Sequence, residues 1–105
     1  MKTTPDGRYL VIDGVLWRRT DPSLSEEEVA ALKSALGRAR AAVKAAKRAG
    51  DEEALRAARR RVHEAKVGLG ERGSVWWDDG SPDLTRRHVA NTVYADWFLR
   101  SDDES

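Results

Sequence analysis

The stretch VAALKSALGRARAAVKAAKRAGDEEALRAARRRVHEAKVGL, from Val29 to Leu69, decides the fold. Its first half places apolar residues three and four positions apart, and the same spacing restarts at Leu55, after Gly50-Asp51. This spacing puts the apolar residues of each half on one side of a helix. It predicts two antiparallel helices, over 25–49 and 51–69, that pack along a coiled-coil-like seam. The predicted seam residues are Val29, Leu32, Leu36, Ala39, Val43, Ala46, Leu55, Ala58, Val62, Ala65 and Leu69.

Local signals mark the ends of both predicted helices. Ser25 and Glu28 have the spacing of a capping box at the start of the first helix. Gly50 suits the left-handed residue that follows a helix, and Asp51 suits the N-cap of the second helix. We therefore expect a helical hairpin with a turn of one or two residues.

A β-hairpin is predicted near the N-terminus, over 8–19. Asp13-Gly14 lies between two runs of β-branched and aromatic residues and suits a type I′ turn, which pairs Ile12 with Val15. Both faces of this hairpin are mostly apolar, so we expect it to pack on the helices. Ser74-Val75-Trp76-Trp77 is the candidate third strand.

The segment over 74–100 combines tryptophans with turn residues. Asp83 is expected to cap a short helix over 84–90, and Thr92 another over 93–99, followed by a disordered tail over 101–105. Together these elements predict a single α+β domain over 1–105. Its core is expected to contain Trp17, Trp76 and Trp97, because aromatic side chains bury large areas.

Composition narrows the class of protein. The chain has 105 residues, of which 35% are charged, and its net charge is +1. The sequence contains no cysteine, which excludes disulfides and thiolate metal sites. No apolar run is long enough to span a bilayer, and no apolar leader precedes the first strand, so we expect a cytoplasmic protein with no membrane partner.

Charge is distributed unevenly along the chain. Between Lys33 and Lys66, eleven basic residues stand against four acidic ones, a surplus of seven, whereas the C-terminal segment is acidic. The basic residues surround the seam rather than forming a single stripe. Arginine and lysine at this density are candidates for binding a phosphate backbone. The candidate phosphate-binding residues are Arg40, Lys44, Lys47, Arg48, Arg56, Arg59, Arg60 and Lys66.

A second candidate site lies in Trp76-Trp77-Asp78-Asp79-Gly80 with Asp83, which we call the Trp-Asp segment. Three carboxylates within six positions favour a structural turn, with hard-cation binding as an alternative, although the spacing does not match an EF-hand loop. An acid–base pair of Asp79 with His88 is a further alternative. The candidate binding residues are Trp77, Asp78, Asp79, Asp83, Arg86, Arg87 and His88. No catalytic residue, metal ligand or cofactor is assigned.

The chain resembles a family of short, functionally uncharacterised bacterial proteins, some of which carry the label "biopolymer transporter Tol". The likeness rests on three stretches: DGRY with LWR near the N-terminus, GERGSVWWDDG from Gly70, and NTVYADWF from Asn91. It extends over nearly the whole chain. The resemblance implies membership of a family but no activity, so it assigns no site residue.

Three functions stay open from the sequence. The first interpretation is a small non-enzymatic interaction module that binds a protein partner. The alternatives are a nucleic-acid-binding accessory protein that uses the basic hairpin, and a small enzyme that uses the region of Asp78, Asp79 and His88. We expect a monomer, or a weak homodimer in which the basic hairpin meets the acidic C-terminal segment.

Overall fold

The computed structural model describes residues 2–104, and side chains from residue 2 to residue 100. The chain divides into two compact units. The sheet unit contains Met1–Arg19 and Trp77–Ser105, and the helical unit contains Thr20–Trp76. A three-stranded sheet with long helices makes the fold α+β, as predicted. Within residues 2–104, no helix is both long enough and apolar enough to cross a membrane.

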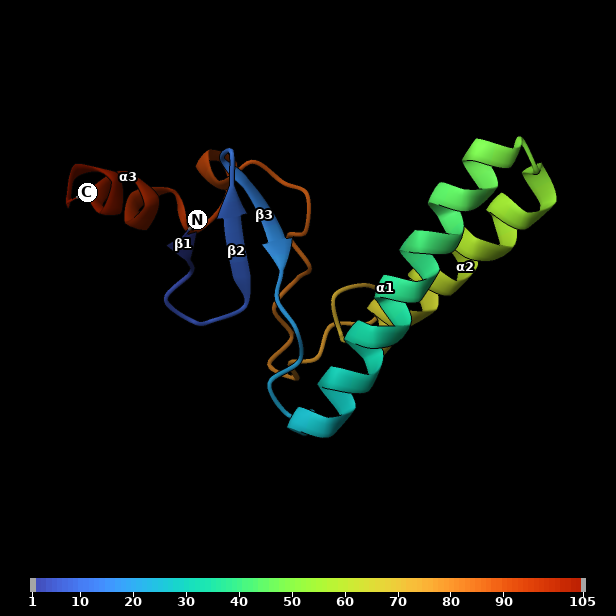
Figure 1. The fold of residues 1–105 in the computed structure, drawn as a ribbon. Coiled ribbons are helices and arrows are strands. Elements are labelled where there is room, and N and C mark those ends of the chain that lie inside the picture. The colour runs from blue at the N-terminus through green and yellow to red at the C-terminus, as the bar shows by residue number, and fades with distance from the viewer. Residues whose placement is uncertain (1, 105) are drawn as a thin grey trace. The chain divides into compact units, whose positions relative to one another are not determined.

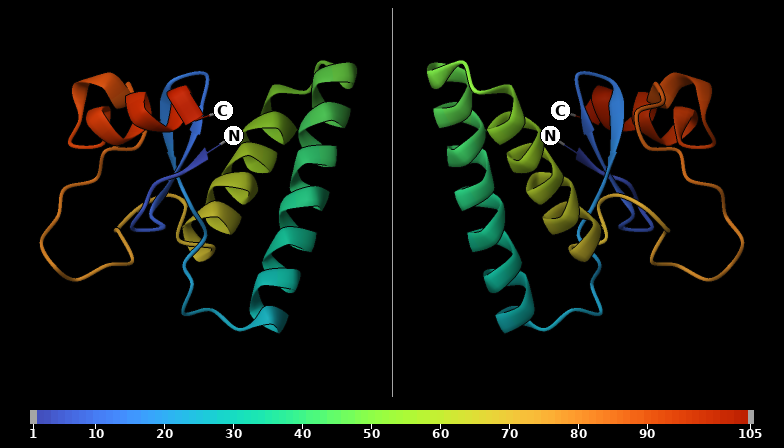
Figure 2. Two further views of the ribbon diagram at one scale, coloured as in Figure 1. Left: turned by 90° about the vertical axis from the view of Figure 1, so that its left-hand side faces the viewer. Right: turned by 90° about the vertical axis from the view of Figure 1, so that its right-hand side faces the viewer.

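The helical unit is an antiparallel hairpin of two helices, α1 (Glu26–Ala49) and α2 (Glu52–Gly68), which run side by side in both views of Figure 2. Ser25 Oγ accepts a hydrogen bond from the Glu28 N–H at 3.0 Å, and the Glu28 carboxylate accepts one from the Ser25 N–H at 3.1 Å. Gly50 adopts a φ of 68°, and Asp51 accepts a hydrogen bond from the Ala54 N–H at 3.0 Å. The predicted caps and turn are therefore confirmed.

The predicted seam is also confirmed, because each of its eleven residues is buried or half-buried. Leu36, Ala65 and Leu69 form the centre of this core. The small residues allow a close approach of the two helices: a Cβ added to Gly68 of α2 lies only 2.8 Å from the Leu32 side chain of α1. The helical unit is thus stabilised along one narrow apolar seam. The two sides of the hairpin that flank this seam carry residues that do not belong to the core.

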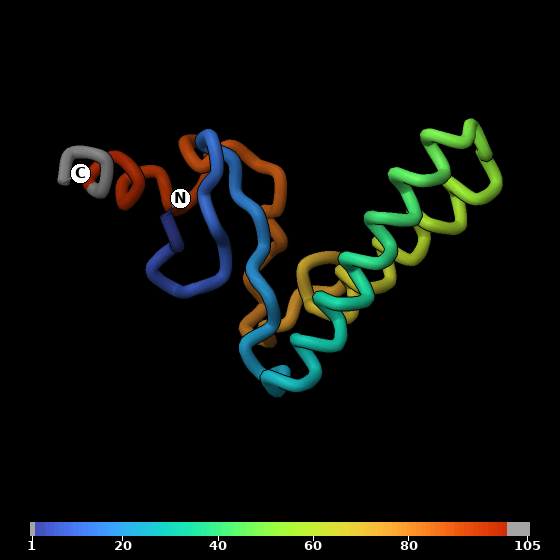
Figure 3. The backbone as a smooth tube through the Cα atoms, in the orientation of Figure 1, coloured from blue at the N-terminus to red at the C-terminus, as the bar shows by residue number. Residues whose placement is uncertain are grey.

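The sheet unit contains three antiparallel strands in the order β1 (Lys2–Thr3), β2 (Tyr9–Ile12) and β3 (Val15–Arg18) (Figures 1 and 3). The register of β2 and β3 is the predicted one, with Ile12 opposite Val15. Asp13 and Gly14 have φ angles of 52° and 77°, as a type I′ turn requires. The predicted third strand over 74–77 is wrong, since the N-terminal residues form the third strand instead and 74–77 is irregular.

The outer edge of β3 is covered by backbone from the C-terminal part of the chain. The Leu16 N–H donates to the Arg87 carbonyl at 2.9 Å, and the Leu16 carbonyl accepts from the Arg86 N–H at 2.7 Å. These bonds explain why the predicted helix over 84–90 is wrong: Arg86 and Arg87 use backbone groups that a helix needs for itself. Arg86 also has a positive φ of 73°, which interrupts helical geometry.

Two short helical elements follow this edge segment, η1 (Val89–Asn91) and α3 (Ala95–Glu104). The final helix begins two residues later than the predicted 93–99. Its backbone continues to Glu104, where a disordered tail had been expected, and Ser105 lies outside the described residues.

The core of the sheet unit lies on one face of the β-hairpin. Tyr9, Val11, Leu16 and Val89 are buried there, and Trp97 packs against them as predicted. Strand residues alternate between faces, so Trp17 lies on the opposite face from this core. The expectation that Trp17 is a core residue is wrong, because 40% of it is exposed. Trp76 is half-buried and belongs to the helical unit.

Candidate functional site

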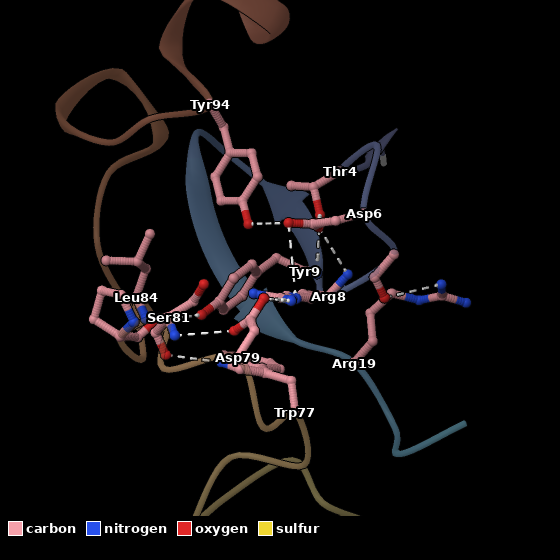
Figure 4. A network of polar contacts seen from close by, with 12 residues as sticks. Thr4, Asp6, Arg8, Tyr9, Arg19, Trp77, Asp79, Ser81, Leu84 and Tyr94 are labelled. Carbon is pink, nitrogen blue, oxygen red and sulfur yellow. Dashed lines mark hydrogen bonds and ion pairs between the residues drawn. The ribbon is translucent and has the colours of Figure 1, made fainter. Parts of the chain in front are cut away.

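Arg8 ties the Trp-Asp segment to the β-hairpin (Figure 4). Its guanidinium group pairs with the Asp79 carboxylate and lies 4.7 Å from the centroid of the Trp77 ring. The Trp77 indole N–H donates a hydrogen bond to the Ser81 carbonyl at 2.8 Å, which closes the turn. The hydrogen bond from Arg8 is the main cause that lowers the pKa of Asp79 to about 2. Asp79 and Trp77 therefore form part of the internal framework of the sheet unit.

Asp83 is also engaged within the fold. Its Oδ2 accepts a hydrogen bond from Arg18 Nη1 at 3.2 Å, and the Arg18 side chain is fully buried. Its Oδ1 accepts from the Thr85 N–H at 3.0 Å. Because burying an unpaired guanidinium is costly, Asp83 stabilises the position of Arg18. Among the side chains of residues 2–100, no three acidic or histidine groups gather closely enough to hold a metal ion.

Among the described residues, no side-chain hydrogen bond or ion pair joins the other candidates for this site to that framework. Arg86, Arg87 and His88 have exposed side chains, and their backbone lies along β3. Asp78 is exposed as well. Among the described residues, no hydrogen bond joins His88 to Asp78 or Asp79, so the structure gives no direct contact for the acid–base alternative.

Four residues at the centre of this network were not singled out as site residues by the sequence interpretation: Asp6, Arg8, Tyr9 and Tyr94. The Tyr94 hydroxyl donates to Asp6 at 2.5 Å. Burial acts to raise the pKa of Asp6, but hydrogen bonds from Tyr94 and Thr4 outweigh it and lower the pKa. Burial, followed by the bond to Asp6, raises the pKa of Tyr94 above its ordinary value. No periodic or motif-level signal links residues so distant in the chain. Arg8 and Tyr9 were noted as part of the predicted β-hairpin, and all four residues lie in the stretches DGRY and NTVYADWF that carry the family resemblance.

A pocket of about 550 Å³ lies beside this network. Its polar groups are largely used within the protein: the Tyr9 hydroxyl accepts from the Leu84 N–H at 2.8 Å and donates to the Pro82 carbonyl at 3.4 Å. The remaining walls are mainly the apolar parts of Leu84, Val93 and Tyr94. The pocket thus offers shape and apolar surface rather than an unsatisfied charge.

The helical hairpin carries a different kind of surface on one of its sides. A groove of about 380 Å³ is lined by Arg40, Val43, Arg59, Val62 and Arg72. Helical residues four and seven positions apart lie on the same side, so basic residues at these spacings from Arg40 and Arg59 extend the surface along both helices. We call this surface the basic face; it consists of Lys33, Arg40, Lys44, Lys47, Arg59, Lys66 and Arg72.

The opposite side of the hairpin is lined mainly by alanine. One groove there includes Ala42, Ala45, Ala54 and Ala57, and a second includes Ala35, Arg38 and Glu64, with Arg61 lining both. We call this side the alanine face. The two sides therefore differ in their lining, although Arg38 and Arg61 keep basic residues on both of them, as expected for basic residues that surround the seam.

Five of the eight candidate phosphate-binding residues lie on the basic face by helical spacing: Arg40, Lys44, Lys47, Arg59 and Lys66. Arg48 and Arg56 lie further round the same side. Arg60 points away from the seam, since it is about half a turn from the seam residues Val62 and Leu55.

The arginines at the centre of the basic face have little internal compensation. Within the described part of the chain, neither Arg40 nor Arg59 forms an ion pair or a hydrogen bond with another residue through its side chain. Arg72 Nη1 lies 3.5 Å from His63 Nδ1. The acidic residue nearest to this side by spacing is Glu52, seven positions before Arg59. Arg40 and Arg59 therefore present positive charge that no acidic side chain of the described residues pairs with.

Comparison with protein-family models, with curated proteins and with solved structures found no match. The resemblance to a family of short bacterial proteins therefore stays a prediction.

Proposed function

We propose that this protein is an interaction module that binds the phosphate backbone of nucleic acid through the basic face of its helical hairpin. The observation that supports this proposal is the segregation of charge: three arginines line the groove on one side of the hairpin, and alanines make up most of the lining of a groove on the other. A helix that is merely solvated has no need to sort its charges in this way, whereas a surface that meets a polyanion does.

The dimensions of the basic face suit several phosphates. Lys33 and Lys47 are two ends of one line on α1, about 21 Å apart at ~1.5 Å per residue. Double-stranded DNA carries a charge about every 1.7 Å along its axis, so a surface of this length meets several phosphates at once. Arg40 and Arg59 add forked donors near the middle of the face, which suit phosphate oxygens. Such contacts bind nucleic acid with little preference for sequence.

The test compares two double variants with equal changes of charge. Arg40→Gln with Arg59→Gln removes one arginine of each helix from the basic face, and Arg38→Gln with Arg61→Gln does the same on the alanine face. Fluorescence anisotropy with a short labelled DNA duplex at low salt measures the affinity of each. We expect the basic-face variant to bind at least about tenfold more weakly than the parent, and the alanine-face variant to bind nearly as the parent does.

Two outcomes contradict the proposal. Absence of binding by the parent at low salt removes nucleic acid as the partner. Equal weakening by both double variants shows that total charge, and not the basic face, is responsible. Circular dichroism of all three proteins establishes that the helices are retained.

Binding of a protein partner is the second candidate function. The face of the β-hairpin opposite the core of the sheet unit supports it. Ile12 and Trp17 on this face are 38% and 40% exposed. Tryptophan is enriched at the centres of protein interfaces. A photo-crosslinker placed at Trp17 in the producing cell tests this candidate: a crosslinked protein that is lost when Ile12→Ser is added supports it, and the absence of any crosslinked protein contradicts it.

A further inference from the structure

The groove at the centre of the basic face is lined by three arginines from three parts of the chain. Arg40 belongs to α1, Arg59 to α2 and Arg72 to the segment that follows α2. None of the described residues that line the groove is acidic. Three like charges around one groove repel each other, and this repulsion is relieved when an anion lies between them.

The apolar lining of the groove and the restricted position of Arg72 strengthen the attraction of the three arginines for an anion. Val43 and Val62 also line the groove and are half-buried seam residues, so they add an apolar surface beside the arginines. Charges beside an apolar surface interact more strongly than charges surrounded by water. Arg72 is half-buried, and its contact with His63 Nδ1 at 3.5 Å leans it against α2. Arg72 is therefore more restricted than a solvated arginine.

We propose that Arg40, Arg59 and Arg72 form a discrete site for a terminal phosphate group, such as a phosphate monoester at the end of a nucleic-acid strand. This inference rests on the proposed function, of which it is the most specific part. A phosphodiester carries one negative charge, whereas a phosphate monoester carries about −1.5 to −2 at neutral pH and presents three acceptor oxygens. Three arginines that line one groove supply enough charge and donors for such a group.

The first experiment uses inorganic phosphate as the probe. Side-chain Nε–H resonances of arginine are followed by NMR while phosphate is added at constant ionic strength. The proposal predicts saturable shifts for Arg40, Arg59 and Arg72, and none for Arg38 or Arg61 on the alanine face. Shifts that do not saturate, or that are equal on both faces, overturn it.

The second experiment separates a terminal phosphate from an internal one. Two otherwise identical duplexes, one with 5′-phosphate and one with 5′-hydroxyl ends, are compared by anisotropy. We expect the phosphorylated duplex to bind several-fold more tightly to the parent protein. Equal affinities overturn the proposal of a terminal phosphate.

A conservative substitution then tests whether the site needs the fork of the guanidinium group. Arg59→Lys keeps the positive charge and removes the bidentate geometry, and Arg61→Lys is the matched control on the alanine face. We expect Arg59→Lys to weaken phosphate binding about tenfold. Binding of the 5′-hydroxyl duplex should change less than about twofold, because the charge is unchanged. Equal phosphate binding by Arg59→Lys and Arg61→Lys overturns the site.

The discrete site and the proposed function fail in different ways. If the 5′-hydroxyl duplex binds but phosphate produces no saturable shift, the site is wrong and the nucleic-acid function stands. If phosphate binds at the three arginines but no duplex binds, the site stands and the nucleic-acid function is wrong.

Discussion

Removing the Tyr9 hydroxyl is expected to destabilise the sheet unit out of proportion to the loss of one oxygen. Tyr9 is only 1% exposed, and its hydroxyl accepts the Leu84 N–H at 2.8 Å. Tyr9→Phe retains the ring contact with Trp77, at 5.6 Å between centroids, but leaves the Leu84 N–H without its partner. An unsatisfied backbone donor costs about 1–3 kcal/mol. Because Leu84 is half-buried and water reaches it in part, we expect about 1–2 kcal/mol.

Two measurements check this value. Urea unfolding gives the change in the free energy of unfolding, and hydrogen exchange followed by NMR reports on the Leu84 amide itself, which should exchange faster in the variant. Tyr9→Ala, which also removes the buried ring, should cost about 3–5 kcal/mol. Tyr94→Phe is the control, because its hydroxyl bond to Asp6 is exposed and should be worth less than about 1 kcal/mol. A Tyr9→Phe protein with parental stability and an unchanged exchange rate at Leu84 would refute the reasoning.

Four further predictions concern stability. Gly70 has a φ of +81°, and an added Cβ lies 2.8 Å from the Asp21 side chain, so Gly70→Ala should cost more than about 1–2 kcal/mol in urea unfolding. Gly37 lies inside α1 with open space around it, so Gly37→Ala should instead stabilise the helical unit by about 0.5–1 kcal/mol in the same assay. Asp79 has a pKa of about 2, below its ordinary 3.8, so its pair with Arg8 stabilises the sheet unit above about pH 4, and this stabilisation is lost as pH falls towards 2. In an acid titration, the stability of Asp79→Asn should therefore fall less over this pH range than that of the parent. Tyr94 has a raised pKa, so its contribution is present below pH 10 and is lost as pH rises above it; Tyr94→Phe should unfold with less dependence on alkaline pH.

The elements whose formation depends on local sequence were predictable. The caps at Ser25 and Asp51, the turn at Gly50 and the turn at Asp13-Gly14 each use residues that are close in the chain. The seam followed from spacing alone, because a helix converts spacing into position. These predictions needed no knowledge of what the rest of the chain does.

The errors occurred where distant parts of the chain decide the structure. A helix over 84–90 has no local objection, but the backbone of Arg86 and Arg87 bonds to Leu16 of β3 instead. The face on which Trp17 lies was predictable from strand alternation, but both faces were apolar, so the sequence did not indicate which one is buried. The third strand failed for a similar reason, since β1 contains only Lys2 and Thr3 and carries no apolar signal.

The candidate sites were predicted with mixed success. Most of the basic residues were named. Which of them share one side of the hairpin depends on how the two antiparallel helices are aligned, and the order of residues along the chain does not show that alignment. Arg72 was missed as a candidate because it lies beyond the helices, and it enters the groove only through the fold. In the Trp-Asp segment, the sequence does not indicate that Asp79 pairs with Arg8 and Asp83 with Arg18. Both carboxylates were therefore candidates for ligand binding until the structure showed these pairs.

The salt dependence of duplex DNA binding by the unmodified protein tests the central claim most directly. Each phosphate neutralised contributes about −0.9 to the slope of log K against log salt concentration. If four to six of the seven residues of the basic face contact phosphates, the slope is about −4 to −5. We expect a slope in this range for the parent, and a slope shallower by about 2 for the protein with Arg40→Gln and Arg59→Gln. A binding constant that does not change with salt, or no binding at low salt, would show that the basic face does not bind phosphates.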